Sequence, residues 1–126
     1  MGSEMCIRDS GYSILHLGSF EQNGNWWLAR KSLGLRSFGM NVVEIPPGDD
    51  IPEHDEVDRD QEEVFVVLEG TPTMVIDDEE HPTEPGTFVR LDVAPRRTMV
   101  NRGSDTARVL IVSAPRTSGY EPMSWA

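Results

Sequence analysis

Short runs of β-type residues separated by turn residues make up almost the whole sequence, and this pattern restricts the chain to an all-β fold. In residues 37–45, Phe38, Met40 and Val42 alternate with the residues between them, at the period of two that a strand requires. Comparable runs occupy residues 63–70, 71–77, 87–93, 96–103 and 107–115. Together with the short apolar run at residues 12–17, they predict about seven to nine short strands arranged as a sandwich or barrel.

Turn residues mark the ends of these runs. The pair Glu69-Gly70 predicts a tight hairpin between residues 63–70 and 71–77, and further turns are expected at residues 77–80 and 101–105. Residues 25–34 are the only contender for a helix. Because Gly24 and Gly34 bound this segment closely, we expect a strand or an irregular arm there.

The length of 126 residues is enough for one domain with one modest core. Within it we expect an N-terminal arm with strands at residues 11–35, a barrel at residues 36–115 and a C-terminal arm at residues 116–126. Residues 1–10 have the appearance of a leader that is not natural and is disordered. The segment from Met5 to Ser10 resembles the translation of a transposon end used in preparing sequencing libraries, which implies a metagenomic gene. The single cysteine, Cys6, lies inside it, so no thiolate or disulfide chemistry is expected.

The charge balance restricts the possible partners. Twenty-two acidic residues against eleven basic ones give a net charge of −11, whereas phosphate backbones and anionic membranes attract clustered Lys and Arg. We therefore expect no nucleic-acid or membrane partner. No run approaches the roughly 18 apolar residues that cross a bilayer, so we expect a soluble, cytoplasmic protein.

One stretch concentrates chemically active side chains. Residues 53–63 hold seven carboxylates and His54, and residues 90–108 hold five of the eleven basic residues. In the strand that follows, Glu63 and Phe65 share one face, whereas Val64 and Val66 share the other. A strand that is apolar on both faces in so small a protein favours a second sheet behind one face and a partner subunit behind the other, so we expect a homodimer.

The spacing of residues 48–70 resembles the first motif of the cupin family. Gly48 is followed by five residues and then His54, and Glu63 is followed by six residues and then Gly70. A second motif runs from residue 84 to Asn101. The resemblance covers residues 42–115 and implies a double-stranded β-helix, or jelly-roll barrel. Because this fold hosts isomerases, dioxygenases, lyases and non-catalytic binders, the function has to be inferred from the site.

The resemblance also implies a site with altered metal ligands. Where the family carries its second and third histidines, this chain carries Glu56 and Arg97. A guanidinium cannot bind a cation, so Arg97 argues against a metal and could itself pair with Glu63. We therefore expect His54 and Glu63 to be catalytic and no cofactor to be required. The residues expected to contact a ligand are Arg97, Glu56, Phe65 and Asn101.

Three functions remain open on these residues. The preferred one is a small-molecule site in which Arg97 orients an anionic or carbonyl compound while His54 or Glu63 moves a proton, as in isomerisation, elimination or ring closure. The second is a binding or structural cupin without turnover. The third is a metal-dependent oxidoreductase or lyase, with a divalent transition metal held by His54, Glu63 and either Glu56 or Asp58.

Other conspicuous residues have simpler explanations. The remaining acids of residues 53–60 are expected to form a solvated loop. We expect His16 and His81 to be ordinary strand or turn residues. The three tryptophans are expected to pack the terminal arms onto the barrel, and sugar stacking by one of them is a lesser alternative: Trp26, Trp27 and Trp125.

Overall fold

The computed structural model describes residues 7–8 and 11–126. Its strands are β1 (Ile7–Arg8), β2 (Ser13–Ile14), β3 (Gln22–Asn23), β4 (Trp26–Trp27), β5 (Gly39–Ile45), β6 (Gln61–Glu69), β7 (Thr73–Ile76), β8 (Glu79–Pro82), β9 (Phe88–Leu91), β10 (Arg97–Val100) and β11 (Ala107–Pro115). A 3₁₀ turn, η2 (Leu17–Ser19), and one short helix, α1 (Ala29–Leu33), complete the described elements. The predicted all-β class is confirmed.

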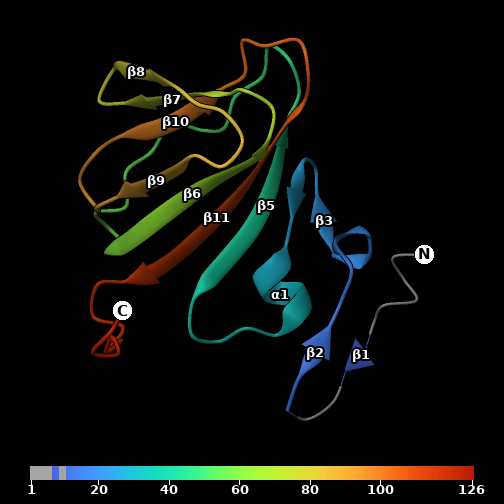
Figure 1. Ribbon diagram of the computed structural model, residues 1–126, viewed down its shortest axis with the longest axis vertical. Coiled ribbons are helices and arrows are strands. Elements are labelled where there is room, and N and C mark those ends of the chain that lie inside the picture. The colour runs from blue at the N-terminus through green and yellow to red at the C-terminus, as the bar shows by residue number, and fades with distance from the viewer. Residues whose placement is uncertain (1–6, 9–10) are drawn as a thin grey trace.

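Two antiparallel sheets enclose the core (Figure 1). The larger has the order β3-β4-β5-β11-β6-β9 and the smaller the order β10-β7-β8. The loop before β6 completes the smaller side, because Asp50 forms a bridge with Val100 and His54 forms one with Arg97. This arrangement is the expected jelly-roll barrel, and it brings the loop that carries His54 against β10.

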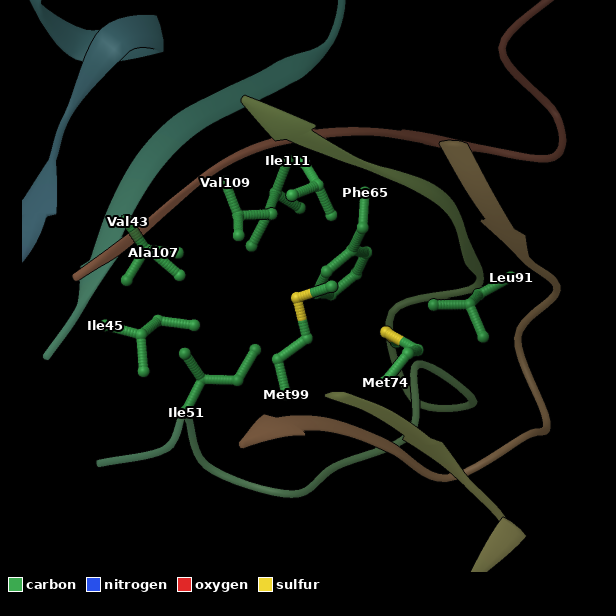
Figure 2. Packing of buried hydrophobic residues seen from close by; sticks show 11 residues of the cluster. Val43, Ile45, Ile51, Phe65, Met74, Leu91, Met99, Ala107, Val109 and Ile111 are labelled. Carbon is green, nitrogen blue, oxygen red and sulfur yellow. The ribbon is translucent and has the colours of Figure 1, made fainter. Parts of the chain in front are cut away.

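Apolar side chains fill the space between the two sheets (Figure 2). The long strands contribute from the larger sheet, and Met74 and Met99 face them from the smaller one. Strand parity holds as expected, since Phe65 and Val67 of β6 are buried in this core. Glu63 has the same parity and is also buried, with only 7 % of its surface exposed. The inward face of β6 therefore carries a carboxylate at one end of an apolar row.

The turn predictions were correct in part. β7 and β8 form a hairpin through Asp77 and Asp78, both at positive φ. The hairpin predicted at Glu69-Gly70 is wrong, because β6 pairs with β9 and β11 whereas β7 pairs with β10 and β8. Gly70 instead carries the chain from one sheet to the other. Its φ is +81°, and a Cβ there would lie 2.8 Å from the Cα of Ala107.

The segment expected to be a strand or irregular arm contains both a strand and a helix. β4 pairs with β5 at its start, and α1 follows directly. Gly34 ends α1 in the left-handed conformation that a glycine C-cap favours. The buried Ser32 hydroxyl accepts a hydrogen bond from the backbone N–H of Glu21 at 2.9 Å. Burial of Ala29 and Ser32 stabilises this five-residue helix, although it is shorter than helices that are stable alone.

The N-terminal leader predicted for residues 1–10, including Cys6, lies outside the described residues except for β1. Ile7 and Arg8 of β1 pair with β2, which differs from the disorder that we expected there. No helix in residues 7–8 and 11–126 is long and apolar enough to span a membrane.

Candidate functional site

His54 and Arg97 occupy opposite positions of an isolated antiparallel bridge. The His54 N–H donates to the Arg97 carbonyl at 3.0 Å, and the Arg97 N–H donates to the His54 carbonyl at 2.8 Å. Directly opposed residues place their side chains on the same face, so both side chains lie on the inner side of the barrel. The backbone thus fixes the two residues next to each other, although they are distant in sequence.

Arg97 is completely buried and lies behind Glu63. Its Nη1 donates to Glu63 Oε1 at 3.0 Å, and its Nη2 donates to the carbonyl of Asp92. No exposed surface remains on Arg97. The geometry therefore gives no support for the prediction that Arg97 contacts a ligand: both terminal nitrogens of the guanidinium donate to protein groups, and Arg97 does not line the hollow described below. It neutralises a buried carboxylate instead.

His54 is the accessible member of the cluster, with 36 % of its side chain exposed. Its Nδ1 lies 3.0 Å from the Pro52 carbonyl, which can only accept a hydrogen bond, so Nδ1 carries a proton. Its Nε2 lies 3.1 Å from Glu56 Oε2 and 3.6 Å from Glu63 Oε1. A lone pair on Nε2 would repel both carboxylates. A proton on Nε2 or a bound cation would therefore stabilise this arrangement.

Glu56 is buried, with 6 % of its surface exposed, whereas the three residues that follow it in the loop are exposed. The Glu56 N–H donates to the Val93 carbonyl at 2.9 Å and turns the side chain inward. Its Oε1 is buried and has no hydrogen-bond partner among the described residues. An unsatisfied buried carboxylate oxygen is costly, so a bound group that supplies a donor or a positive charge would stabilise it.

The neighbours of Glu63 change its acidity. Burial, and secondarily the charge of Glu56, raise the pKa of the Glu63 carboxyl, while Arg97 and His54 oppose this rise without cancelling it. A carboxyl group with a raised pKa is a stronger base when ionised and holds its proton to higher pH. Both properties suit proton transfer near neutral pH.

A hollow of about 280 Å³ opens onto this cluster. Four of the predicted site residues line it: His54, Glu56, Glu63 and Phe65. The remaining residues that line it are Trp26, Arg30, Gly39, Met40, Asn41, Arg59, Gln61, Ile111 and Ser113. Trp26 therefore belongs to the hollow as well as packing against the core, and the other two tryptophans do not line it.

Asn101 does not join the cluster. Its side chain is fully buried, its Nδ2 donates to the carbonyls of Ile45 and Asp105, and its Oδ1 accepts from the Gly103 N–H. All of these partners are backbone groups around the turn that follows β10. The geometry thus gives Asn101 a structural role at this turn in place of the predicted ligand contact.

The acidic segment of residues 53–63 and the basic segment of residues 90–108 form ion pairs with each other. Arg96 lies 3.5 Å from Glu53 and 3.8 Å from Asp55, and Arg90 pairs with Glu62. His16 caps the 3₁₀ turn and His81 pairs with Glu79, so both are local structural residues. Sequence reasoning missed the basic residues Arg30 and Arg59 in the hollow. The glycine cap at Gly34 was the signal that could have revealed α1, which carries Arg30.

The cluster also satisfies simple requirements for a cation site. One donor atom from each of His54, Glu56 and Glu63 lies within 4.8 Å of the other two. One imidazole and two carboxylates form a donor set suited to Mn, Fe or Zn, and the orphaned Glu56 Oε1 supplies a further oxygen. The nearby Arg97 guanidinium weakens such a site, because it already shares Glu63 Oε1. These residues fit a divalent ion, with a positive charge close behind one ligand.

The fold and the hollow define an antiparallel β-barrel protein with a polar site at one end of the barrel. The family model described as "Cupin domain" matches residues 41–113. The chain therefore belongs to the cupin domain family, and the predicted double-stranded β-helix is confirmed.

Several solved structures resemble the chain. A cupin protein from Bacteroides fragilis has a TM-score of 0.77 at 17 % identity, covering 93 % of this chain and 94 % of that one. A sugar phosphate isomerase of the cupin superfamily from Silicibacter pomeroyi has a TM-score of 0.63 at 27 % identity, covering 72 % of this chain and 60 % of that one.

A candidate sugar phosphate isomerase from Acidithiobacillus ferrooxidans has a TM-score of 0.58 at 26 % identity, covering 67 % of this chain and 54 % of that one. The chain thus spans little more than half the length of these two proteins. A comparison with curated protein sequences found no match.

Proposed function

We propose that this cupin is an acid–base isomerase of small hydroxycarbonyl compounds, with His54 and Glu63 as the proton-transfer groups. The observation that carries the proposal is the geometry around His54: Nδ1 lies at 3.0 Å from the Pro52 carbonyl, and Nε2 faces the carboxylates of Glu56 and Glu63 at 3.1 and 3.6 Å. The resemblance to two proteins described as a sugar phosphate isomerase and a candidate sugar phosphate isomerase favours isomerisation over elimination or ring closure.

The chemistry follows from the positions of these groups. The Glu63 carboxylate removes the proton from the carbon next to the carbonyl, while the His54 imidazolium gives its Nε2 proton to the carbonyl oxygen, which yields an enediol. Glu63 then returns its proton to the neighbouring carbon, and Nε2 takes back a hydroxyl proton. Arg97 keeps Glu63 ionisable in a buried position, and Phe65 and Trp26 exclude water from one wall of the hollow.

The test is hydrogen exchange at carbon. The protein is incubated in D₂O with a panel of aldoses, ketoses and their phosphates, and NMR follows deuterium incorporation next to the carbonyl. We expect His54→Gln and Glu63→Gln to reduce the exchange rate by about 10²-fold or more. Glu62→Gln is the matched control, because Glu62 neighbours Glu63 in sequence but pairs with Arg90 on the outer side. The absence of exchange with every panel member, or equal rates in the Glu62 and Glu63 variants, would refute the proposal.

A second candidate function is metal-dependent catalysis, which the convergence of His54, Glu56 and Glu63 within 4.8 Å favours. These three residues would hold a divalent ion, which would supply Lewis-acid polarisation of a substrate oxygen. Elemental analysis of protein purified without a chelator or an affinity tag distinguishes the candidates. A near-stoichiometric transition metal that is absent from His54→Ala and Glu56→Ala supports the metal site, and exchange activity that survives dialysis against a chelator rejects it.

Arg97→His probes the same question from the other side of the bridge. The change would place a second imidazole opposite His54 and remove a positive charge. If a cation binds here, affinity for added zinc rises, and it rises more than in Arg97→Met, which removes the charge without adding a donor. Equal zinc affinity in these two variants would show that position 97 is not a ligand position.

A further inference from the structure

Among residues 11–126, the arginines without carboxylate partners gather at one place on the protein. Ten of the eleven Lys and Arg residues lie in residues 11–126. Seven of these form ion pairs with carboxylates: Lys31, Arg90, Arg96, Arg97, Arg102, Arg108 and Arg116. The other three, Arg30, Arg36 and Arg59, form no ion pair with any residue that the structure describes, although acids outnumber bases two to one.

All three of these arginines line adjoining hollows. Arg30, Arg36 and Arg59 line an outer hollow of about 420 Å³, and Arg30 and Arg59 also line the inner hollow that holds His54. The two hollows further share Gly39, Gln61 and Ser113. They are therefore adjoining parts of one depression, with positive charge at its outer part and the carboxylate cluster in its inner part.

Three separate parts of the chain supply these side chains. Arg30 comes from α1, Arg36 from the loop between α1 and β5, and Arg59 from the loop before β6. Arg30 uses one Nη1 hydrogen bond to the Leu35 carbonyl at 3.3 Å, which anchors the side chain and leaves its remaining donors available. All three residues are exposed at the surface. Their donors can therefore reach a ligand.

We propose that Arg30, Arg36 and Arg59 form a binding site for the phosphate group of a phosphorylated substrate. Guanidinium groups bind phosphate through paired N–H donors. Three guanidinium groups together suit a doubly charged phosphate better than they suit a carboxylate, which carries one charge. On a protein with a net charge of −11 such a local positive rim is also what an anionic ligand requires to approach the site.

The orientation of the substrate in this proposal rests on the proposed function. A phosphate held in the outer hollow directs the other end of the molecule into the inner hollow, where His54 and Glu63 lie. The substrate class is then a phosphorylated hydroxycarbonyl compound, bound with its phosphate outward and its carbonyl inward. Arg97 has no part in binding it.

The test measures binding separately from turnover, with inorganic phosphate and acetate as probes. Two-dimensional NMR at constant ionic strength follows the arginine Nε–H signals and the backbone N–H of Gln61 during titration. We expect saturable phosphate binding, tighter than acetate binding, that weakens about tenfold in each of Arg30→Gln, Arg36→Gln and Arg59→Gln. Arg102→Gln is the matched control, because it removes the same charge at a surface pair with Glu80, and it should change the dissociation constant less than twofold.

The outcomes separate the two proposals. If phosphate binds through the three arginines and no compound undergoes exchange in D₂O, the anion site stands and the isomerase fails. If an uncharged hydroxyketone undergoes exchange while phosphate does not saturate, or while Arg102→Gln weakens binding equally, the anion site is overturned and the isomerase stands. If His54→Gln retains phosphate binding, this supports the placement of the phosphate end of the substrate in the outer hollow and of its carbonyl end in the inner hollow. If the three variants dissociate an oligomer and do not alter phosphate binding, the depression is occupied by a second copy of the chain. This result also overturns the anion site.

Discussion

Glu63→Gln is predicted to destabilise the protein far more than the same change at the neighbouring Glu62. Arg97 is fully buried, and its only carboxylate partner among the described residues is Glu63, at 3.0 Å. Removal of one member of a buried ion pair leaves an uncompensated charge, which costs about 3–5 kcal/mol. Glu62 is 44 % exposed and pairs with Arg90, and such a surface pair contributes about 0–1 kcal/mol.

Urea denaturation measures this difference. With a slope of about 2 kcal/mol per M, a loss of 3–5 kcal/mol lowers the urea midpoint by roughly 1.5–2.5 M, whereas Glu62→Gln should lower it by less than about 0.5 M. Because a small domain has about 5–15 kcal/mol in total, Glu63→Gln also brings the protein close to the folding threshold. Equal midpoints for the two variants would refute the assignment of Arg97 to a buried pair.

A double-mutant cycle tests the cause of the loss. Arg97→Met removes the buried charge and leaves Glu63, which can take up a proton because its pKa is already raised. The combination of Arg97→Met with Glu63→Gln should therefore cost less than the sum of the single changes, with a coupling free energy of about 2 kcal/mol or more. Additive effects would mean that the two side chains do not stabilise each other.

Two further predictions follow from backbone geometry and surface exposure. Gly70→Ala should cost about 2–4 kcal/mol and Gly48→Ala only about 1 kcal/mol in urea denaturation, because both have positive φ but only the Cβ at residue 70 meets backbone, at 2.8 Å. The expected homodimer would cover the outer face of the larger sheet, where Leu68 and Phe88 are exposed. Light scattering should then report twice the chain mass for the wild type and the monomer mass for Phe88→Asp, and a monomeric wild type would refute it.

The sequence predicted the positions of Glu63 and Phe65 because strand parity is a local property. Alternation in residues 63–68 places every second side chain inward, whichever strands lie beside β6. The wrong hairpin at Gly70 has the opposite cause. Whether β6 pairs with β7 or with β9 and β11 depends on contacts between distant segments, which a turn signal between neighbouring runs does not specify.

The exposure of each site residue could not be predicted from the sequence either. The family spacing placed Arg97 beside His54 correctly, and the bridge between them confirms this neighbourhood. Its burial, however, depends on Glu63 of β6 and on the Asp92 carbonyl in the loop between β9 and β10. The arginines at the mouth of the hollow were missed because their convergence requires α1 and two loops, and the local pattern gave no sign of that convergence.

The distribution of cations explains how one acidic chain can hold a carboxylate cluster and still admit an anionic ligand. The buried guanidinium of Arg97 lies behind Glu63 and offsets one charge of the cluster, so the inner hollow is less repulsive than its two glutamates alone would make it. The exposed guanidinium groups of Arg30 and Arg59 remain in solvent at the mouth, where their desolvation penalty is small until a ligand arrives. An anionic group is therefore stabilised at the mouth and repelled from the inner carboxylates. Charge alone would thus orient a bifunctional molecule, with its uncharged carbonyl end toward His54.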